Sequence, residues 1–128
     1  MQIHQSAEDY LETILMLNQR MGRVRSIDVV NELGYTKASV SIAMKKLREN
    51  GYIAVDGEGN LTLLEPGREI AERIYSRHRL LTHFFVQLGV DEEVASEDAC
   101  KAEHILSEQT LEKIREYALL HDAQDSVK

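Results

Sequence analysis

The feature that most constrains the fold is a pair of short helical patterns separated by a tight turn. Apolar residues recur at helical spacing over residues 26–33 and again over residues 37–49. Ser26 and Thr36 stand where the two helices would begin, and either side chain can cap a helix. Gly34-Tyr35 supplies the turn between them, so the segment predicts a helix-turn-helix. The residues expected to face inward are Ile27, Val30 and Leu33 on the first helix and Val40, Ala43, Met44 and Leu47 on the second.

A β-hairpin pattern follows directly. Residues 52–55 and 60–63 have the composition of short strands, and Asp56-Gly57-Glu58-Gly59 between them is typical of a turn. A helix-turn-helix followed by a hairpin predicts a winged helix-turn-helix. Because the tip of this wing is acidic, we expect it to contribute little to phosphate contact.

The rest of the chain has helical periodicity, and the single proline and scarcity of aromatic residues favour a mainly α fold. Ser6 and Asp9 have capping-box spacing at the first helix, and Asp91 and Ser107 are expected caps of the last two. We expect a winged helix-turn-helix domain over residues 1–65 and an all-helical domain over residues 66–128, with a frayed tail from His121. The predicted helices outside the helix-turn-helix cover residues 6–20, 66–88, 91–106 and 107–120.

Composition narrows the cellular setting. Cys100 is the only cysteine, so an intramolecular disulfide is impossible, which fits a reducing cytosol. The first 20 residues contain no long apolar run, so we expect neither a signal peptide nor a membrane span. A cytoplasmic protein is the expectation.

Charge is distributed unevenly along the chain. The formal net charge is −7, but residues 20–48 carry seven basic and only two acidic residues, whereas residues 89–128 carry eleven acidic and four basic ones. A polarised chain can present a basic face to double-stranded DNA while its other end repels phosphate. An ordinary solvated charge pattern is the alternative interpretation.

The second helix of the helix-turn-helix would place its N-terminal residues against base edges in the major groove. Because arginine is scarce there, we expect sequence specificity to come partly from apolar contacts, water and DNA shape. A helical hairpin that packs against another protein is the competing interpretation. The expected base-proximal residues are Thr36, Lys37, Ala38, Ser39 and Ser41, and the expected phosphate contacts are Arg23, Arg25, Lys45, Lys46 and Arg48.

Residues 100–104 predict a metal site. On a helix, Cys100, Glu103 and His104 stand at i, i+3 and i+4 and project from one face. Other predicted helices offer further donors, namely Asp9 and Glu12 at i, i+3 and His78 in the long helix. A mixed shell of this kind suits Mn(II) or Fe(II), while the thiolate favours Fe(II), Co(II) or Zn(II).

Each candidate ligand also has an ordinary structural interpretation. Asp9 can serve the capping box with Ser6, Glu12 can be a solvated helix-face residue, and His78 a surface histidine. Cys100 by itself can be a small buried apolar residue. The clustering of Cys100 with Glu103 and His104 favours metal, because a carboxylate buried without a partner is costly. The remaining histidines, assigned to solvent or packing, are His4, His83 and His121.

From Ala7 to about Tyr117 the sequence resembles the diphtheria toxin repressor and manganese transport regulator family of metal-dependent transcriptional repressors. The segments that carry the resemblance are Glu8-Asp9-Tyr10-Leu11-Glu12, Ser39-Val40-Ser41, Arg77-His78-Arg79-Leu80-Leu81, Gly89-Val90-Asp91 and Cys100-Lys101-Ala102-Glu103-His104. The resemblance implies a homodimer joined through its C-terminal helical dimerisation domain, with metal fixing the paired recognition helices on operator DNA. It implies repression of metal-uptake genes. The family's metal positions correspond to Asp9, Glu12, His78, Cys100, Glu103 and His104.

The implied site is a hybrid of two branches of that family. Asp9 and Glu12 resemble the manganese branch, whereas Cys100 resembles the iron branch. Thr82 and Ser96 stand where the iron branch carries ancillary ligands, so a second site is incomplete, and one or two ions per subunit are expected. The chain ends before the SH3-like domain of the iron branch, as the manganese branch does. We expect Mn(II) narrowly ahead of Fe(II), with Co(II) or Zn(II) able to substitute and with no organic cofactor.

Two other classes of function compete with this interpretation. An enzyme could use a Cys100–His104 pair, but the sequence offers no orienting third group and no Gly-rich oxyanion loop. A winged-helix regulator that responds to an organic ligand, with the polar cluster serving only structure, is the alternative. Metal content after purification without chelators distinguishes it from a metal-dependent regulator.

Overall fold

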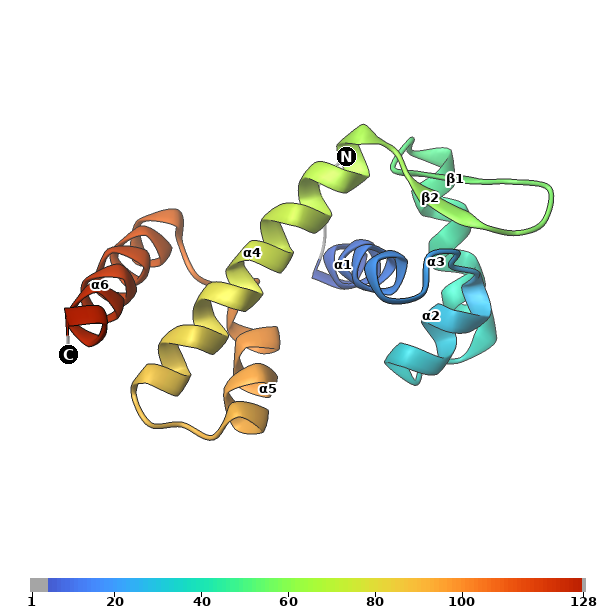
Figure 1. The fold of residues 1–128 in the computed structure, drawn as a ribbon. Helices are drawn as coiled ribbons and strands as arrows, with labels where there is room; N and C mark the ends of the chain where they lie inside the picture. Colours follow the sequence, from blue (N-terminus) through green and yellow to red (C-terminus); the bar gives the residue numbers. More distant parts are fainter. Residues whose placement is uncertain (1–4, 128) are drawn as a thin grey trace. The chain divides into compact units, whose positions relative to one another are not determined.

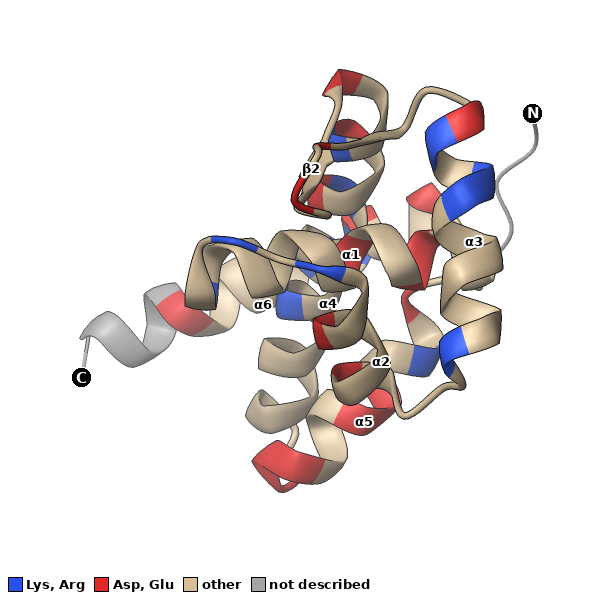
Figure 2. Cartoon of the chain, turned by 90° about the vertical axis from the view of Figure 1, so that its right-hand side faces the viewer, with Lys and Arg blue, Asp and Glu red and all other residues tan. Residues whose placement is uncertain are grey.

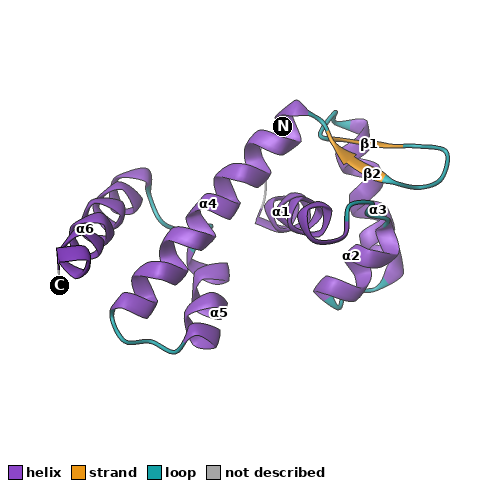
Figure 3. Ribbon diagram, viewed as in Figure 1, coloured by secondary structure: helices purple, strands orange, loops and turns teal. Residues whose placement is uncertain are grey.

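The computed structural model describes residues 5–127 and forms two compact units, which divide between Arg73 and Ile74 (Figure 1). The division falls within helix α4. Helices dominate both units, with one two-stranded sheet in the first (Figure 3). Within the described residues, no helix combines the length and the apolarity needed to cross a membrane. The elements are α1 (Gln5–Met21), α2 (Ser26–Leu33), α3 (Lys37–Glu49), β1 (Ile53–Val55), β2 (Leu61–Leu63), α4 (Glu65–Gln87), α5 (Glu92–Ala102) and α6 (Glu108–Val127).

The core of the first unit is built around α1, which packs against α2, α3 and β2. Leu11 and Ile14 of α1 are completely buried, as are Val29 of α2 and Val40 of α3. Fully burying an aliphatic side chain of this size stabilises a fold by about 1.5–3 kcal/mol relative to leaving it exposed. Helix α1 is therefore the central element of this unit.

The helix-turn-helix has the predicted boundaries. Thr36 caps α3 as expected, since its Oγ1 accepts a hydrogen bond from the Ser39 N–H at 3.1 Å. Gly34 adopts a left-handed conformation with φ of 72°, which glycine tolerates best and which ends α2.

Two expectations for α2 were wrong. The N-cap of α2 is Arg25 and not Ser26, and the Asp28 carboxylate accepts a hydrogen bond from the Arg25 N–H at 2.9 Å. Ile27 is 43% exposed, and Val29 is completely buried in its place. The apolar run of α2 offered two possible inward stripes, and packing against α1 and α3 selected the one containing Val29.

The wing is one residue shorter per strand than the pattern suggested. Strands β1 and β2 pair antiparallel, with Ile53 opposite Leu63. The chain before α2 joins them, because the Leu61 N–H donates to the Val24 carbonyl at 2.7 Å. Gly67 fixes the exit from the wing into α4, because a Cβ at that position would lie 2.2 Å from the Tyr52 carbonyl oxygen.

The second unit is a three-helix assembly of the remainder of α4 with α5 and α6. Its core contains Leu81, Ala99 and Leu111, with Phe85 and Leu106 packed against it. Ser107 caps α6 as predicted, its Oγ accepting a hydrogen bond from the Thr110 N–H at 3.2 Å.

Three expectations for this unit were wrong. Helix α5 ends at Ala102 instead of Leu106, because the Ile105 N–H turns back to the Ala102 carbonyl at 3.1 Å. Asp91 stands at the N-cap of α5, but its side chain makes no capping hydrogen bond. Helix α6 continues to Val127 instead of fraying from His121, whose ring lies 4.3 Å from that of Tyr117.

Candidate metal centre and nucleic-acid interface

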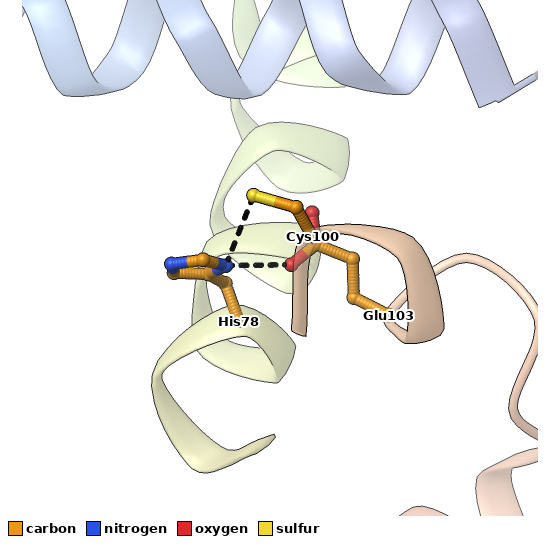
Figure 4. Close-up of side chains that lie close together, drawn as sticks. All are labelled: His78, Cys100 and Glu103. Atoms are coloured by element: carbon orange, nitrogen blue, oxygen red, sulfur yellow. Dashed lines mark hydrogen bonds and ion pairs between the residues drawn. The ribbon is translucent and has the colours of Figure 1, made fainter. Parts of the chain in front are cut away.

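Three of the predicted ligands converge within the second unit (Figure 4). His78 comes from α4, Cys100 from α5, and Glu103 from the residue that follows α5. Glu103 Oε2 lies 3.0 Å from His78 Nδ1, and Cys100 Sγ lies 3.7 Å from the same nitrogen. One donor atom from each side chain falls within 4.8 Å of the other two. A nitrogen, an oxygen and a sulfur donor therefore surround one small volume.

Although α5 ends earlier than predicted, the side chains of Cys100 and Glu103 remain close together. Glu103 is the C-cap but retains right-handed helical angles, with φ of −59° and ψ of −22°, and its N–H donates to the Ala99 carbonyl. Glu103 therefore remains about one helical turn after Cys100, on the same face of the chain. His104 belongs to the following turn and not to a continuous helix face, and its Nε2 lies 3.4 Å from Glu103 Oε1. The one-face prediction holds for Cys100 and Glu103 and was wrong for His104.

The carboxylate of Glu103 is the most buried charged group of this cluster. Its residue is completely inaccessible, while the side chains of His78 and His104 are 15% and 1% exposed and Cys100 is exposed. Among the described residues, Glu103 Oε1 has no hydrogen-bond donor. A buried carboxylate is stable only when positive charge or donors compensate it, so the interior of this cluster favours cations.

The proximity of these groups changes the protonation of His78. The hydrogen bonds to Cys100 and, next, to Glu103 raise the pKa of His78 to about 10, although burial acts in the opposite direction. Without metal, the imidazole is therefore protonated at neutral pH and compensates the buried carboxylate. A metal ion must displace this proton, because a coordinated imidazole is neutral.

The two positions expected to form an incomplete ancillary site also lie near His78. Ser96 Oγ is 3.4 Å from His78 Nε2. The buried Thr82 Oγ1 has no hydrogen-bond partner in the described part of the chain. Neither hydroxyl is a strong ligand for a transition metal, so the expectation of an incomplete second site stays a prediction.

Asp9 and Glu12 lie on α1, in the first unit. Asp9 is half-buried and Glu12 is 6% exposed, so Glu12 is not the solvated residue of the ordinary interpretation. Ser6 lies inside α1, which begins at Gln5, so it is not an N-cap and the capping-box interpretation of Asp9 was wrong. A ligand role for Asp9 and Glu12 stays a prediction.

Of the remaining histidines that the structure describes, neither His83 nor His121 belongs to the cluster of His78, Cys100 and Glu103. His83 is 52% exposed and its Nε2 lies 3.0 Å from Asp122 Oδ1, which joins α4 to α6. His121 stacks on Tyr117. His4 lies outside the described residues.

Every residue that the sequence assigned to DNA is exposed. The basic positions of α3, drawn in blue in Figure 2, lie at its start (Lys37) and near its end (Lys45, Lys46 and Arg48). Thr36 is the least free of these residues, because its hydroxyl accepts from the Ser39 N–H and donates to Ser39 Oγ at 2.9 Å. The exposed residues of the predicted interface are Arg23, Arg25, Thr36, Lys37, Ala38, Ser39, Ser41, Lys45, Lys46 and Arg48.

The wing engages both arginines that precede α2. Glu58 Oε2 lies 3.8 Å from Arg23 Nη1, and the guanidinium of Arg25 lies against Gly59. Asp56 organises the tip, where hydrogen bonds from Asn60, through its N–H first, lower the pKa of the Asp56 carboxyl. The acidic tip is thus structural, and it partly neutralises Arg23.

Sequence reasoning missed one residue of this surface. Ile42 of α3 is 59% exposed among the polar and basic side chains of the helix. The available signal was its spacing, since it lies off the stripe formed by Val40, Met44 and Leu47.

Comparison with known proteins assigns both units. Residues 2–61 match the family model of the iron dependent repressor N-terminal DNA binding domain, and residues 64–120 match that of its metal binding and dimerisation domain. An HTH-type transcriptional regulator of Methanocaldococcus jannaschii is 37% identical over 113 residues, which cover 87% of this chain and 90% of the relative. The regulator MntR of Bacillus subtilis is 32% identical over 96% of this chain and 87% of its own length.

Solved structures agree with this assignment. A manganese-dependent transcriptional repressor in complex with manganese matches with a TM-score of 0.80 and 28% identity, over 88% of this chain and 52% of that one. IdeR of T. acidophilum shares the fold, with a TM-score of 0.80, 23% identity and coverage of 91% and 55%. The chain thus spans about half the length of these solved proteins. It belongs to the iron-dependent repressor family of metal-dependent, DNA-binding transcriptional regulators, the family of the diphtheria toxin repressor and the manganese transport regulators.

Proposed function

We propose that this regulator is a homodimeric, cytoplasmic repressor of metal-uptake genes that binds operator DNA when its centre holds Mn(II) or Fe(II). The observation that carries the proposal is the convergence of His78, Cys100 and the fully buried Glu103. The basic surface of α3 supplies the DNA-binding half of the activity. No organic cofactor is needed.

The residues present fit a divalent cation. Glu103 Oε1 is buried and accepts no hydrogen bond from any residue that the structure describes, while His78 and Cys100 present nitrogen and sulfur donors beside the other oxygen. A bound cation supplies fixed positive charge at a place where the chain otherwise relies on a protonated imidazole. His104 adjoins the same carboxylate and is the fourth proposed ligand of this unit.

Asp9 and Glu12 are the proposed ligands from the first unit. Both lie on α1, which also carries the core residues Leu11 and Ile14 of the DNA-binding unit. Ligands on α1 would therefore link occupancy of the centre to the orientation of the whole DNA-binding unit. A tenfold change in operator affinity requires only about 1.4 kcal/mol of such coupling.

The choice of metal follows from the donor set. The three carboxylates and two imidazoles of the proposed ligand set suit Mn(II) and Fe(II), whereas the Cys100 thiolate favours Fe(II), Co(II) and Zn(II). We place Mn(II) narrowly ahead of Fe(II), with one or two ions per subunit. Solved relatives with bound manganese and with bound Zn²⁺ support a divalent cation without deciding between metals.

On DNA, we propose that α3 enters the major groove with Lys37, Ala38, Ser39 and Ser41 near base edges. Lys45 and Lys46 would bind phosphates. Arg23 and Arg25 are the proposed phosphate contacts that precede α2, with Arg23 weakened by its ion pair to Glu58.

The test is operator binding measured under anaerobic conditions with Mn(II), Fe(II), Co(II) and Zn(II) titrated in parallel. The duplex is obtained by selection from a random pool, and the oligomeric state is measured by analytical ultracentrifugation. We expect a dimer whose DNA affinity rises at least tenfold with the preferred metal. DNA binding that no metal changes, in a protein purified without metal, would favour a regulator of organic-ligand type.

A further inference from the structure

One residue of α3 departs from the division between a buried and a polar face. The buried side of the helix consists of Val40, Met44 and Leu47, which are 0%, 4% and 2% exposed. Ile42 is 59% exposed, although it is as apolar as those three residues. Its position two residues after Val40 places it about 200° around the helix, on the side away from the core.

The surroundings of Ile42 are those of a DNA-binding surface. Ala38 lies one turn before it, Lys45 nearly one turn after it, and both are exposed. Ile42 also lines a hollow of about 310 Å³ together with Lys45 and Arg48. Single exposed apolar residues are common, so exposure alone would carry no argument. Here the apolar strip of Ala38 and Ile42 is flanked by cations that attract phosphate.

The composition of α3 limits the readers of polar base edges at its N-terminal end to Lys37 and the two serines, Ser39 and Ser41. The helix contains no Asn or Gln, and its single Arg, Arg48, is its penultimate residue. Bidentate recognition of adenine by Asn or Gln is therefore impossible from this helix, and recognition of guanine by Arg is confined to its far end. The C5-methyl group of thymine is the one apolar group that base edges present in the major groove.

We propose that Ile42 reads thymine in the operator by packing against its C5-methyl group, with Ala38 extending the same apolar contact. The inference rests on the proposed function and adds a specificity-determining residue to it. Loss of one methyl contact corresponds to roughly a three- to fivefold loss of affinity, on the scale of one buried methylene.

The experiment uses the full-length protein with Mn(II) and a duplex selected by it from a random pool. Each thymine of the selected site is replaced in turn by deoxyuridine, which differs from thymidine only in lacking the methyl group. We expect the wild type to lose roughly three- to fivefold in affinity at one or two positions in each half-site. Ile42→Ala should bind the thymine and uracil duplexes equally at those positions.

Ile27→Ala is the matched control, because Ile27 is 43% exposed in the same unit but lies on α2. This variant should retain the wild-type preference for thymine over uracil. Both substitutions remove exposed side chains, and unchanged melting temperatures would verify that both variants fold.

The possible failures are distinguishable. If Ile42→Ala retains the wild-type ratio of thymine to uracil affinity, whether or not overall binding weakens, the inference is wrong while the proposed function stands. If selection with the wild type enriches no sequence, with or without metal, the proposed function fails and the inference fails with it.

Discussion

The DNA-facing surface of α3 and the cluster of His78, Cys100 and Glu103 are constructed in opposite ways. The surface consists of neighbouring residues of one helix, all of them exposed and each able to act alone. The cluster brings together side chains separated by more than 20 residues around one carboxylate that is completely buried. Contacts with solvent-exposed phosphates are individually weak and roughly additive, whereas buried charged groups depend on one another.

This difference predicts a contrast in mutational behaviour. Removal of one cluster residue should abolish the response to metal, while removal of one surface residue should only reduce affinity. The following predictions test that contrast, from the largest expected effect to the smallest.

Glu103→Gln should have the largest effect. The amide retains the shape of the side chain but removes the negative charge. Because loss of a residue that only supports a ligand costs about 10- to 100-fold, we expect loss of this proposed ligand to lower metal-stimulated operator binding by roughly 100-fold or more. Electrophoretic mobility shift with titrated Mn(II) measures it. The metal-free protein should lose stability, because the substitution leaves the protonated imidazole of His78 without its carboxylate partner, so melting curves must show that the variant is still folded.

Glu97→Ala is the control for this prediction, because Glu97 lies exposed on the same helix, α5. Asp9→Ala extends the test to the first unit, where we also expect loss of the metal response in a folded dimer. Full metal-dependent retardation by either Glu103→Gln or Asp9→Ala would remove that residue from the proposed ligand set.

The pH dependence of metal affinity should be the next largest effect. The pKa of His78 is raised to about 10, so the metal-free imidazole is protonated at pH 7 and metal must displace that proton. Apparent affinity should therefore rise with pH by up to about tenfold per unit below pH 10, and His78→Gln should flatten this dependence. Isothermal titration in two buffers of different ionisation enthalpy measures the released proton.

The same pKa shift has a consequence for stability without metal. Because the folded-state pKa of His78 lies above its ordinary value of 6.5, the stabilisation is complete below pH 6.5 and is lost as pH rises towards about 10. Between pH 6.5 and about pH 10, the melting temperature of the metal-free wild type should therefore fall more than that of His78→Gln. Parallel melting curves for the two proteins would contradict the assignment.

Some helix boundaries could be predicted from the sequence and others could not. The boundaries of α2 and α3 were predictable because Gly34 and the Thr36 cap act locally. The end of α5 was not, because Glu103 and His104 continue an acceptable helical pattern, and only the turn to Ser107 and the start of α6 shows where the helix stops.

The cluster of His78, Cys100 and Glu103 could likewise be predicted only in part from the sequence. Cys100 and Glu103 share a helical spacing, and His78 was a candidate because it offers an imidazole on another predicted helix. The local pattern does not indicate that this helix would bring His78 to the other two residues, and the family resemblance supplied that correspondence. Ile42 was missed for the converse reason. Its spacing placed it off the stripe of Val40, Met44 and Leu47, but an isoleucine in a helix normally predicts burial, and the structure shows it to be 59% exposed.

On the surface side of the comparison, Lys45→Ala should reduce DNA affinity by a few-fold for all sequences alike. Its ammonium group is exposed and assigned to a phosphate, so the slope of log affinity against log salt should fall by about 0.9. Fluorescence anisotropy over a range of salt concentrations, with selected and random duplexes, measures both quantities. A loss confined to the selected duplex would show that Lys45 reads a base.

The smallest effect should come from the wing, where Glu58 competes with phosphate for Arg23. The two side chains are 78% and 84% exposed and 3.8 Å apart, a geometry in which an ion pair contributes little. Glu58→Gln should therefore raise DNA affinity only about twofold at low salt, with the gain disappearing at high salt because exposed charges are screened. The double variant Arg23→Gln with Glu58→Gln should bind no better than Arg23→Gln alone if the gain acts through Arg23. An equal gain in both backgrounds would instead mean that Glu58 repels DNA directly, in which case the acidic wing tip itself lies near the phosphates.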